Sequence, residues 1–179
     1  MRVISGQLSG RIFDSPKSKS THPMAEKVRG GLFNSLGDIS GMTVLDAYAG
    51  SGAVAIEAIS RGASHAVAVE NDKQAYRTII QNVEQLGLHD SVDVFLKQIT
   101  SWVAGHRDMS FDIVIADPPY TDLRRDVLLK IALRSTQNGL FVLSWPGREK
   151  IPPFSGFKLL QAKAYGDAQL IYYVRATAE

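Results

Sequence analysis

The chain has 179 residues, which suits one domain and leaves little room for a second. It contains no cysteine, so disulfides, thiolate metal sites and thiol nucleophiles are excluded, and no apolar run approaches the roughly 18 residues that span a bilayer. The formal net charge is only +2, but basic residues crowd the first thirty positions, where only Asp14 and Glu26 are acidic. We therefore expect a cytoplasmic protein without a signal peptide, a metal site or a membrane contact, whose N-terminal segment carries the positive charge.

The first residues are predicted to form a small hairpin, with strands at 2–5 and 11–14 joined by a turn. A hairpin of this size needs support from the rest of the protein. We expect residues 1–20 to be a basic extension and residues 21–179 to form the main body of a single domain. A helix that ends at Leu36 is predicted next, because apolar residues recur at helical spacing on one of its faces.

From residue 43 the pattern alternates between strands and helices, which is typical of a parallel sheet covered on both faces. The predicted strands are residues 43–46, 65–69, 92–96, 111–116 and 140–145, and the predicted helices are residues 53–61, 72–86, 99–104 and 124–135. Asn138 and Gly139 are predicted to form the turn before the fifth strand. Residues 157–164 and 169–174 are predicted to close the chain as an antiparallel hairpin. The fold class that follows is α/β.

Two candidate ligand-binding features lie where the first two strands of this pattern end. Gly50 and Gly52 allow a tight strand-to-helix turn and a close approach of the backbone to a ligand. Glu70 ends the second strand, where a carboxylate can accept hydrogen bonds from both hydroxyls of a ribose. Because ligands bind outside the C-terminal ends of parallel strands, the two features together indicate a nucleoside cofactor.

Asp46 favours one class of nucleoside cofactor over another. A carboxylate just before the glycine turn would repel the pyrophosphate of a dinucleotide. The same carboxylate can accept a hydrogen bond from the ammonium group of S-adenosylmethionine (SAM) or lie near its positive sulfur. Alternatively, Asp46 caps a loop and Glu70 helps to cap the next helix. Both acids together with Asp117 make this purely structural interpretation the weaker one.

The sequence Asp117-Pro118-Pro119-Tyr120 follows an apolar strand and is the candidate reaction centre. Proline has no amide hydrogen, so the backbone cannot continue as a sheet here, and the Asp117 carboxylate and the Pro118 carbonyl can both accept hydrogen bonds from a ligand. Two adjacent acceptors suit an exocyclic amino group, and Tyr120 can stack on a planar base. The alternative is an ordinary turn that ends the strand, with a capping Asp and a surface Tyr. We expect the carboxylates of Asp46, Glu70 and Asp117 to share one rim.

These motifs resemble those of class I SAM-dependent methyltransferases that act on exocyclic amines. The resemblance lies in residues 44–52 (VLDAYAGSG), Glu70 and residues 117–120 (DPPY). Residues 21–24, 28–36 and 165–167 resemble the RsmD family, the bacterial guanine-N2 methyltransferases of small-subunit ribosomal RNA. The resemblance implies a Rossmann-like fold with a mostly parallel seven-stranded sheet. It also implies a monomer that methylates one guanine of 16S ribosomal RNA, either as free RNA or within the small ribosomal subunit or an assembly intermediate.

The motifs and the resemblance together give individual residues expected roles. The expected catalytic residues are Asp117, Pro118, Pro119 and Tyr120. The expected SAM-binding residues are Asp46, Tyr48, Gly50, Ser51, Gly52, Glu70, Asn71, Gln98 and Ile99. The residues expected to contact RNA are Arg2, Arg11, Lys17, Lys19, His22, Lys27 and Arg29. The chain departs from the family pattern at His22, where Arg is usual, and at Gln98, where Asp is usual. Relatives also tend to be more acidic at the end of the fifth strand, and Ser144 there is given no role.

Three other functions stay open at this point. A DNA adenine-N6 methyltransferase could use the same DPPY sequence, although no separate target-recognition domain is visible. An NAD-dependent oxidoreductase could use the glycine turn and the acid after it. An RNA-binding assembly factor could have kept the fold and lost the activity.

Overall fold

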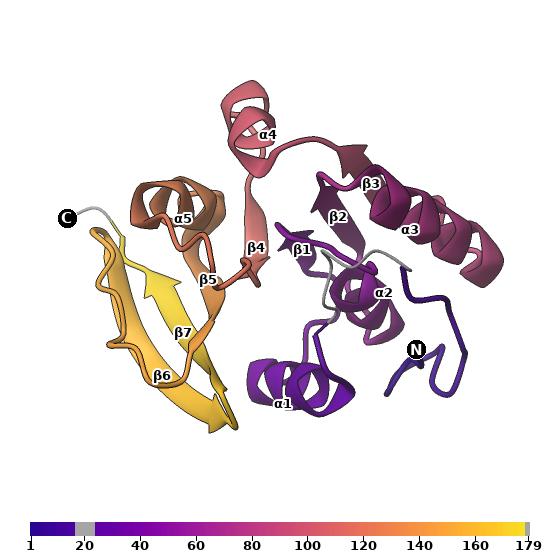
Figure 1. Cartoon of the computed structure of the whole chain (residues 1–179), viewed down its shortest axis with the longest axis horizontal. Coiled ribbons are helices and arrows are strands. Elements are labelled where there is room, and N and C mark those ends of the chain that lie inside the picture. The colour runs from indigo at the N-terminus through magenta and orange to yellow at the C-terminus, as the bar shows by residue number, and fades with distance from the viewer. Residues whose placement is uncertain (17–23, 178–179) are drawn as a thin grey trace. The chain divides into compact units, whose positions relative to one another are not determined.

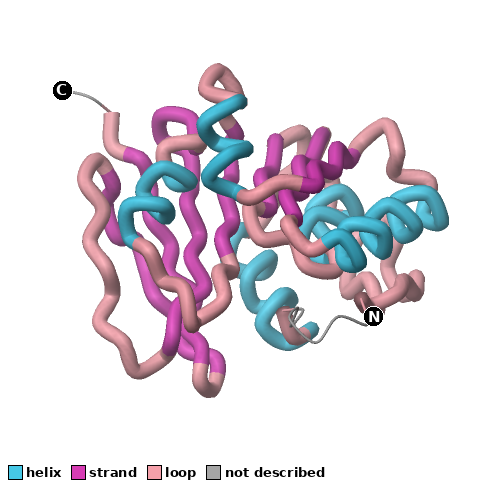
Figure 2. The backbone as a smooth tube through the Cα atoms, turned by 45° about the horizontal axis from the view of Figure 1, so that its top comes forward, coloured by secondary structure: helices cyan, strands magenta, loops and turns pink. Residues whose placement is uncertain are grey.

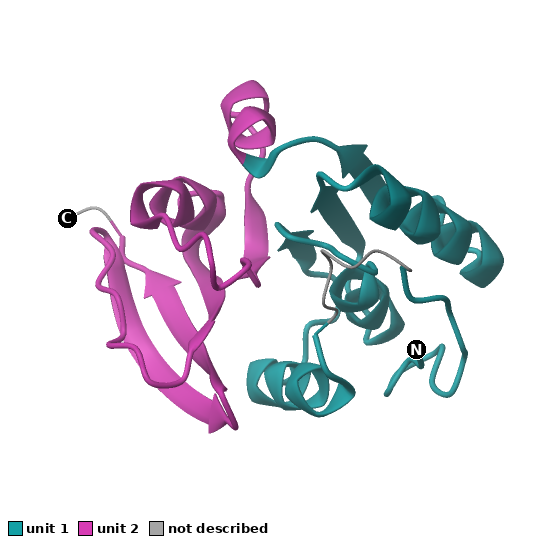
Figure 3. Cartoon of the chain, in the orientation of Figure 1, with its two compact units in different colours: residues 1–99 teal, residues 100–179 magenta. Residues whose placement is uncertain are grey.

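The computed structural model describes residues 1–16 and 24–177, in two compact units that divide after Ile99 (Figures 1 and 3). The expected roles of Lys17, Lys19 and His22 fall outside the described residues. The expectation of a single domain with a boundary at residue 20 stays a prediction. None of the helices in the described part of the chain has the length and apolar character that crossing a membrane requires.

The first unit, residues 1–99, contains three strands in the order β3-β2-β1, and both pairs of neighbours are parallel (Figure 1). Its elements are α1 (Glu26–Leu36), β1 (Thr43–Asp46), α2 (Ala53–Ser60), β2 (His65–Glu70), α3 (Lys73–Leu86) and β3 (Val92–Leu96). Each parallel connection passes through a helix, as parallel strands require. The predicted strands and helices of this part are confirmed, with small shifts at their ends.

Apolar side chains form the core around the strands of the first unit. Val44, Leu45 and residues 66–69 are almost completely excluded from solvent. The helix between β2 and β3, α3, is capped at its N-terminus by Asp72, whose carboxylate accepts a hydrogen bond from the Ala75 N–H at 2.8 Å. This packing fixes the points at which β1 and β2 deliver their C-terminal residues.

The two arms of the N-terminal segment, residues 1–16, pair antiparallel, as the predicted hairpin requires: the Val3 N–H donates to the Arg11 carbonyl at 2.9 Å, and the Phe13 N–H donates to the Met1 carbonyl at 3.0 Å. The segment forms one antiparallel bridge, between Arg2 and Ile12. The backbone N–H of Ile4 instead donates to the carboxylate of Glu57 on α2 at 2.8 Å. Because Glu57 accepts from the N–H groups of Ile4 and Ser5, the antiparallel pairing ends after Val3 and is shorter than the predicted strands at 2–5 and 11–14.

Glycine lets the N-terminal segment approach α2 closely. Gly6 has a φ of +86°, and a Cβ atom at this position would lie 1.8 Å from the carbonyl oxygen of Ser60. The same carbonyl accepts a hydrogen bond from the Gln7 N–H at 2.7 Å. Val3 and Phe13 bury their side chains almost completely. The N-terminal segment is therefore part of the folded unit.

The second unit, residues 100–179, contains four strands in the order β4-β5-β7-β6 (Figures 1 and 2). Its elements are β4 (Phe111–Ala116), α5 (Arg125–Ala132), β5 (Ser135–Pro146), β6 (Phe157–Tyr165) and β7 (Ala168–Arg175), and α4 (Ile99–Gly105) begins at the boundary. β4 and β5 are parallel, whereas β7 is antiparallel to both β5 and β6. The expected C-terminal antiparallel hairpin is confirmed as β6 and β7.

β5 begins earlier than predicted, and the predicted turn at Asn138 and Gly139 is wrong. Both residues lie inside the strand, which starts at Ser135, and α5 ends correspondingly early at Ala132. Asn138 has a φ of +60°, and the register between β4 and β5 shifts in this stretch. The left-handed conformation that the turn prediction required is present, but it produces a bulge within a continuous strand.

An aromatic cluster forms part of the core of the second unit. Phe141 stacks on Tyr173 with 5.8 Å between ring centroids, and Phe154 packs edge-on against both rings. The Tyr173 hydroxyl donates to the Pro152 carbonyl at 2.7 Å, and burial raises the pKa of this tyrosine. The large aromatic side chains that are buried in the described part of the chain include Trp102, Trp145, Tyr172 and Tyr173.

Candidate functional site

The turn after β1 is held in one conformation. Gly50 and Gly52 have φ values of +56° and +75°, which favour glycine. A Cβ atom at Gly52 would lie 2.9 Å from a side-chain carbon of Ile79 on α3, so the turn also requires glycine for close packing. The Gly50 N–H donates to Glu70 Oε2 at 2.7 Å. These contacts give the tight strand-to-helix turn that the sequence predicted.

Glu70 holds this turn through a set of backbone hydrogen bonds that sequence reasoning missed. Besides the bond from Gly50, its Oε1 accepts from the N–H groups of Asn71 at 2.8 Å and Asp72 at 2.7 Å. A carboxylate has about four acceptor positions, so three backbone donors leave about one for a ligand. The side chain is only 8% exposed. Its expected role as acceptor for both ribose hydroxyls stays a prediction.

The structure gathers the expected SAM-binding residues at one edge of the first unit's sheet. The strands β1, β2 and β3 are parallel, so their C-terminal ends meet at the same edge. The residues at or just after these ends are Asp46, Tyr48, Gly50, Ser51, Gly52, Glu70, Asn71, Gln98 and Ile99. All three strands therefore contribute polar groups to one place.

Individual side chains at this edge have the polarity that a nucleoside ligand needs. Asp46 is buried at the end of β1. The Ser51 hydroxyl is buried and has no hydrogen-bond partner among the described residues. Asn71 and Gln98 are exposed, and the Asn71 amide donates to the Gln98 side-chain oxygen at 3.4 Å. A buried hydroxyl without a partner at a glycine turn is an observation that a bound ligand would explain.

The expected reaction centre lies at the end of β4 in the second unit. β4 pairs in parallel with β5, and the register that joins Ala116 to Leu143 brings Asp117 beside Ser144. The side chains of Asp117 and Ser144 share a hydrogen bond. The Tyr120 hydroxyl oxygen lies 3.0 Å from the same Ser144 Oγ, and Tyr120 is 42% exposed. Three side chains thus form one connected polar group.

Burial dominates the acid–base properties of this group. It raises the pKa of the Asp117 carboxyl above its ordinary value, and the hydrogen bond with Ser144 opposes that shift. It also raises the pKa of the Tyr120 hydroxyl; Ser144 opposes this shift, and the nearby charge of Asp117 adds to it. Asp117 is therefore a weaker acid than an exposed aspartate, which suits a group that exchanges a proton during a reaction.

Ser144 is the member of this polar group to which sequence reasoning gave no role. A signal was available, because a hydroxyl followed an apolar run at the end of the next parallel strand. Only the β4–β5 register, however, places it beside Asp117. The predicted common rim of Asp46, Glu70 and Asp117 joins residues of both units and stays a prediction.

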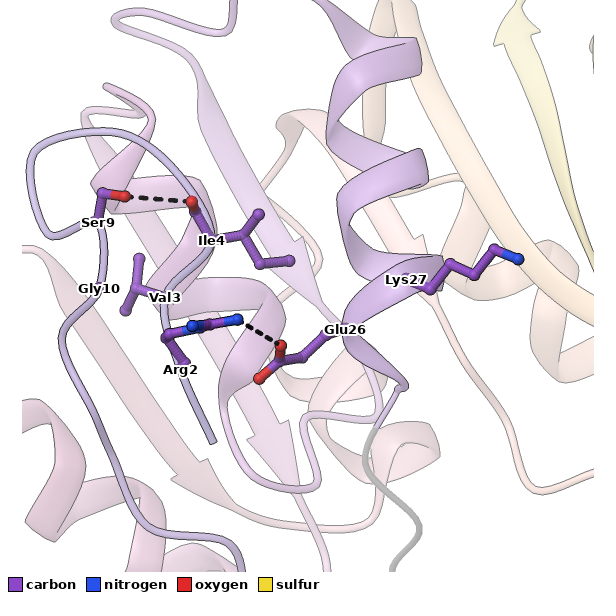
Figure 4. A pocket seen from close by; sticks show the side chains of 7 residues that line it. All are labelled: Arg2, Val3, Ile4, Ser9, Gly10, Glu26 and Lys27. Carbon is purple, nitrogen blue, oxygen red and sulfur yellow. Dashed lines mark hydrogen bonds and ion pairs between the residues drawn. The ribbon is translucent and has the colours of Figure 1, made fainter.

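A hollow of about 360 Å³ lies in the first unit among the expected RNA-binding residues (Figure 4). Its lining residues are Arg2, Val3, Ile4, Ser9, Gly10, Glu26 and Lys27. In Figure 4 the Arg2 side chain points toward Glu26, at 3.6 Å, whereas Lys27 extends away from this pair. Arg2, Lys27 and Arg11 are all exposed, which a phosphate contact requires. The RNA contacts of these three residues stay predictions.

Arg29 does not fit its expected role, and its assignment to RNA is wrong. The side chain is 0% exposed. It donates a hydrogen bond to the Arg2 carbonyl at 2.6 Å and forms an ion pair with the equally buried Glu57 at 3.6 Å. Burial lowers the pKa of Arg29, and the charge of Glu57 opposes that shift. A guanidinium enclosed in this way joins α1, α2 and the N-terminal segment and cannot reach a phosphate.

A family model described as "Conserved hypothetical protein 95" matches residues 1–174 of the chain. The Escherichia coli K12 protein named "Ribosomal RNA small subunit methyltransferase D" is 30% identical over 94% of this chain and 93% of its own length. The chain belongs to this family, the RsmD family. The RsmD-family protein of the same name from Haemophilus influenzae is 31% identical over 67% of this chain and 64% of its own length.

Solved structures also resemble this RsmD-family chain over nearly its whole length. The Escherichia coli protein yhhF, which is assigned as a methyltransferase, superimposes with a TM-score of 0.85 at 28% identity, covering 98% of each chain. A hypothetical protein from Thermus thermophilus gives a TM-score of 0.81 at 26% identity, covering 96% of this chain and 98% of its own. The expected fold is therefore confirmed: an α/β, Rossmann-like class I methyltransferase with a mostly parallel seven-stranded sheet and an antiparallel C-terminal hairpin. The small N-terminal hairpin of that expectation is present as a short antiparallel pairing around Arg2 and Ile12.

Within residues 1–16 and 24–177, no three His, Asp or Glu side chains gather where they could hold a metal ion.

Proposed function

We propose that this chain is a SAM-dependent methyltransferase that transfers a methyl group to the exocyclic N2 amine of one guanine in 16S ribosomal RNA. One observation carries the proposal: Asp117, two prolines and the half-exposed Tyr120 follow a buried strand in a chain of the RsmD family. Relatives named ribosomal RNA methyltransferases favour RNA over a DNA adenine substrate. They also favour methyl transfer over the hydride transfer of an oxidoreductase.

SAM supplies an activated methyl group, and the edge residues of the first unit fit its polar groups. The glycine turn lets the backbone approach the ligand, and the Ser51 hydroxyl is available to it. Asp46 can accept from the ammonium group, and the exposed Gln98 amide oxygen can accept from the adenine amino group without carrying a charge. Glu70 keeps the turn in the shape that these contacts need.

The residues of β4 and its loop address the main chemical difficulty, which is that the guanine amine is a poor nucleophile. Its lone pair is delocalised into the ring. When Asp117 and the Pro118 carbonyl accept its two hydrogens, the nitrogen can rehybridise and direct the lone pair at the methyl carbon. The nitrogen must lose one proton after the transfer, and Asp117, with its raised pKa, is suited to accept it. Tyr120 would stack on the base, which must leave its own stack to enter the pocket.

RNA capture belongs to the exposed basic residues Arg2, Arg11 and Lys27 of the first unit. Such contacts bind phosphates without reading sequence, and their affinity falls with salt. The partner is 16S ribosomal RNA, alone or in the small subunit or its assembly intermediates, and this partner places the reaction in the cytoplasm. We propose that the protein acts as a monomer.

Asp117→Ala should lower methyl transfer by at least about a hundredfold, as expected when a group that positions and deprotonates the amine is lost. SAM binding should survive, because the expected SAM contacts lie in the other unit. Transfer of labelled methyl to RNA and calorimetric SAM binding measure the two effects. Asp122→Ala is the matched control, since Asp122 is an exposed carboxylate of the same loop that pairs with Arg124 at 2.9 Å. Near wild-type turnover of Asp117→Ala would remove Asp117 from the mechanism.

The substrate itself is tested with small ribosomal subunits from cells that lack the enzyme. After incubation with labelled SAM, the label should map to the N2 amine of a single guanine in the 16S RNA. Label on an adenine or on a ribosomal protein would contradict the proposal. Absence of any transfer would favour the inactive assembly factor.

A further inference from the structure

Ser144 is a buried hydroxyl that lies between two residues of the proposed reaction centre. Its Oγ lies 3.0 Å from the Tyr120 hydroxyl oxygen, and it also shares a hydrogen bond with the Asp117 carboxylate. The backbone that carries this side chain is held within the sheet, because β5 pairs with β4 on one side and with β7 on the other. One small side chain on a rigid strand therefore connects the acid to the aromatic ring.

Proton counting gives this chain of hydrogen bonds a direction. A serine hydroxyl has one proton to donate, and an ionised carboxylate can only accept. When Asp117 is ionised, Ser144 must donate to it, and the Tyr120 hydroxyl must then donate to Ser144. Ser144 thereby restrains the rotation of the Asp117 carboxylate. The Tyr120 hydroxyl is hydrogen-bonded to the same Ser144 Oγ, which restrains the position of the ring.

We propose that Ser144 is a positioning residue of the methyl-transfer site, which fixes the Asp117 carboxylate and the Tyr120 ring relative to one another. The Asp117 carboxylate can then accept a hydrogen bond from the amine while the Tyr120 ring stacks on the face of the same base. This inference rests on the proposed function, because the orientation matters only if an amine is held there. A misplacement of about 1 Å at a reacting group can cost about a hundredfold in rate, so one hydroxyl can have a large effect.

The test compares Ser144→Ala with a matched control on the same strand. Ser135, at the start of β5, is also buried, and its hydroxyl donates to the Ala132 carbonyl at 2.8 Å. We expect Ser144→Ala to lower kcat by about tenfold or more, which is the effect of losing one hydrogen bond to a charged group, and to leave the KM for SAM unchanged. Ser135→Ala should keep the wild-type kcat, and Ser144→Thr, which retains a hydroxyl, should recover most of it.

The pH profile provides a readout that a merely structural role would not change. Asp117 must be ionised to accept the amine hydrogens, so kcat falls as the pH drops through its pKa. The Ser144 hydrogen bond lowers that pKa against the effect of burial. Its loss should therefore move the acid limb of kcat to higher pH in Ser144→Ala. The limb should stay in place in Ser135→Ala.

The same shift can be measured without activity, by NMR titration of the Asp117 carboxyl carbon in the free protein. If the pKa of Asp117 is the same in the wild type and in Ser144→Ala, the proposal is overturned. Failure of the proposed function would look different: the wild type would transfer no methyl group, while the titration would still report on Ser144. If Ser144→Ala does not fold, Tyr120→Phe is the second test, because it removes the hydroxyl that bonds to Ser144. A wild-type kcat in Tyr120→Phe would overturn the proposal that Ser144 positions the Tyr120 ring.

Discussion

Glu70 combines a structural task with the expected task of binding SAM. Its two carboxylate oxygens accept from three backbone N–H groups, which join the turn after β1 to the residues after β2. Hydrogen bonds to charged acceptors are stronger than neutral ones. Glu70 therefore shapes the glycine turn before any ligand arrives.

Glu70→Gln should weaken SAM binding by about tenfold and lower the free energy of unfolding by about 1 to 3 kcal/mol. The amide group of Gln has only one acceptor oxygen, so its NH2 group would face a backbone N–H donor. Calorimetry with SAM and urea unfolding measure the two effects. Glu84→Gln makes the same change on an exposed position of α3 and should alter neither. Equal SAM affinity of Glu70→Gln and the wild type would contradict this role.

The residue types of the site could be predicted from the sequence, but the surroundings of each side chain could not. The acids and glycines stand next to strand ends that periodicity identifies, so their positions followed directly. Arg29 looked like Arg2 in the sequence, because both lie in a basic segment. Arg29 is buried against Glu57, whereas Arg2 is exposed, and this difference depends on how α1 packs on α2.

At the scale of elements, the contact between the N-terminal segment and α2 gives a sharp prediction. Gly6 and Gly10 both have left-handed φ values, of +86° and +81°, in the same loop. A Cβ atom at Gly6 would clash with the Ser60 carbonyl, whereas one at Gly10 would meet nothing within 4 Å. Gly10→Ala should cost only the backbone strain, about 1 kcal/mol. Gly6→Ala should cost more than about 3 kcal/mol, because overpacking adds to the strain.

Urea unfolding of the two variants measures this difference, and Gly10→Ala is the control for Gly6→Ala. Equal losses of unfolding free energy would mean that the close approach of Gly6 to Ser60 does not contribute to stability.

The regular elements were predictable where a helix or strand has a clear apolar period, as in α3 and β4. The bulge in β5 was not, because Asn138 and Gly139 favour positive φ in a turn and in a bulge alike. Pairing with β4 and β7 decides between the two. The N-terminal hairpin is shorter than predicted for a similar reason, since Glu57, which is distant in sequence, accepts from the backbone N–H groups of Ile4 and Ser5.

At the scale of the molecule, the N-terminal segment has two functions, and a deletion would remove both at once. It carries two of the exposed basic residues, Arg2 and Arg11, and it also satisfies buried polar groups of the helices. Asn82 on α3, for example, exchanges hydrogen bonds with the backbone of Asp14 at 2.8 and 3.0 Å. Removal of residues 1–16 would leave such groups without partners and destabilise the first unit, whatever its effect on RNA.

Replacing the charged side chains while the backbone is kept avoids this problem. The triple variant Arg2→Gln, Arg11→Gln, Lys27→Gln keeps the backbone contacts and loses only the exposed Arg2–Glu26 ion pair, which contributes little to stability. If each cation neutralises one phosphate, the slope of log affinity against log salt should fall in magnitude by about 2 to 3. Filter binding to 16S RNA across a salt series measures this slope. The control variant Arg148→Gln, Lys150→Gln, Lys158→Gln removes the same charge from exposed positions of the second unit. An equal loss of slope in both variants would mean that the N-terminal residues act only through net charge and make no local contact with RNA.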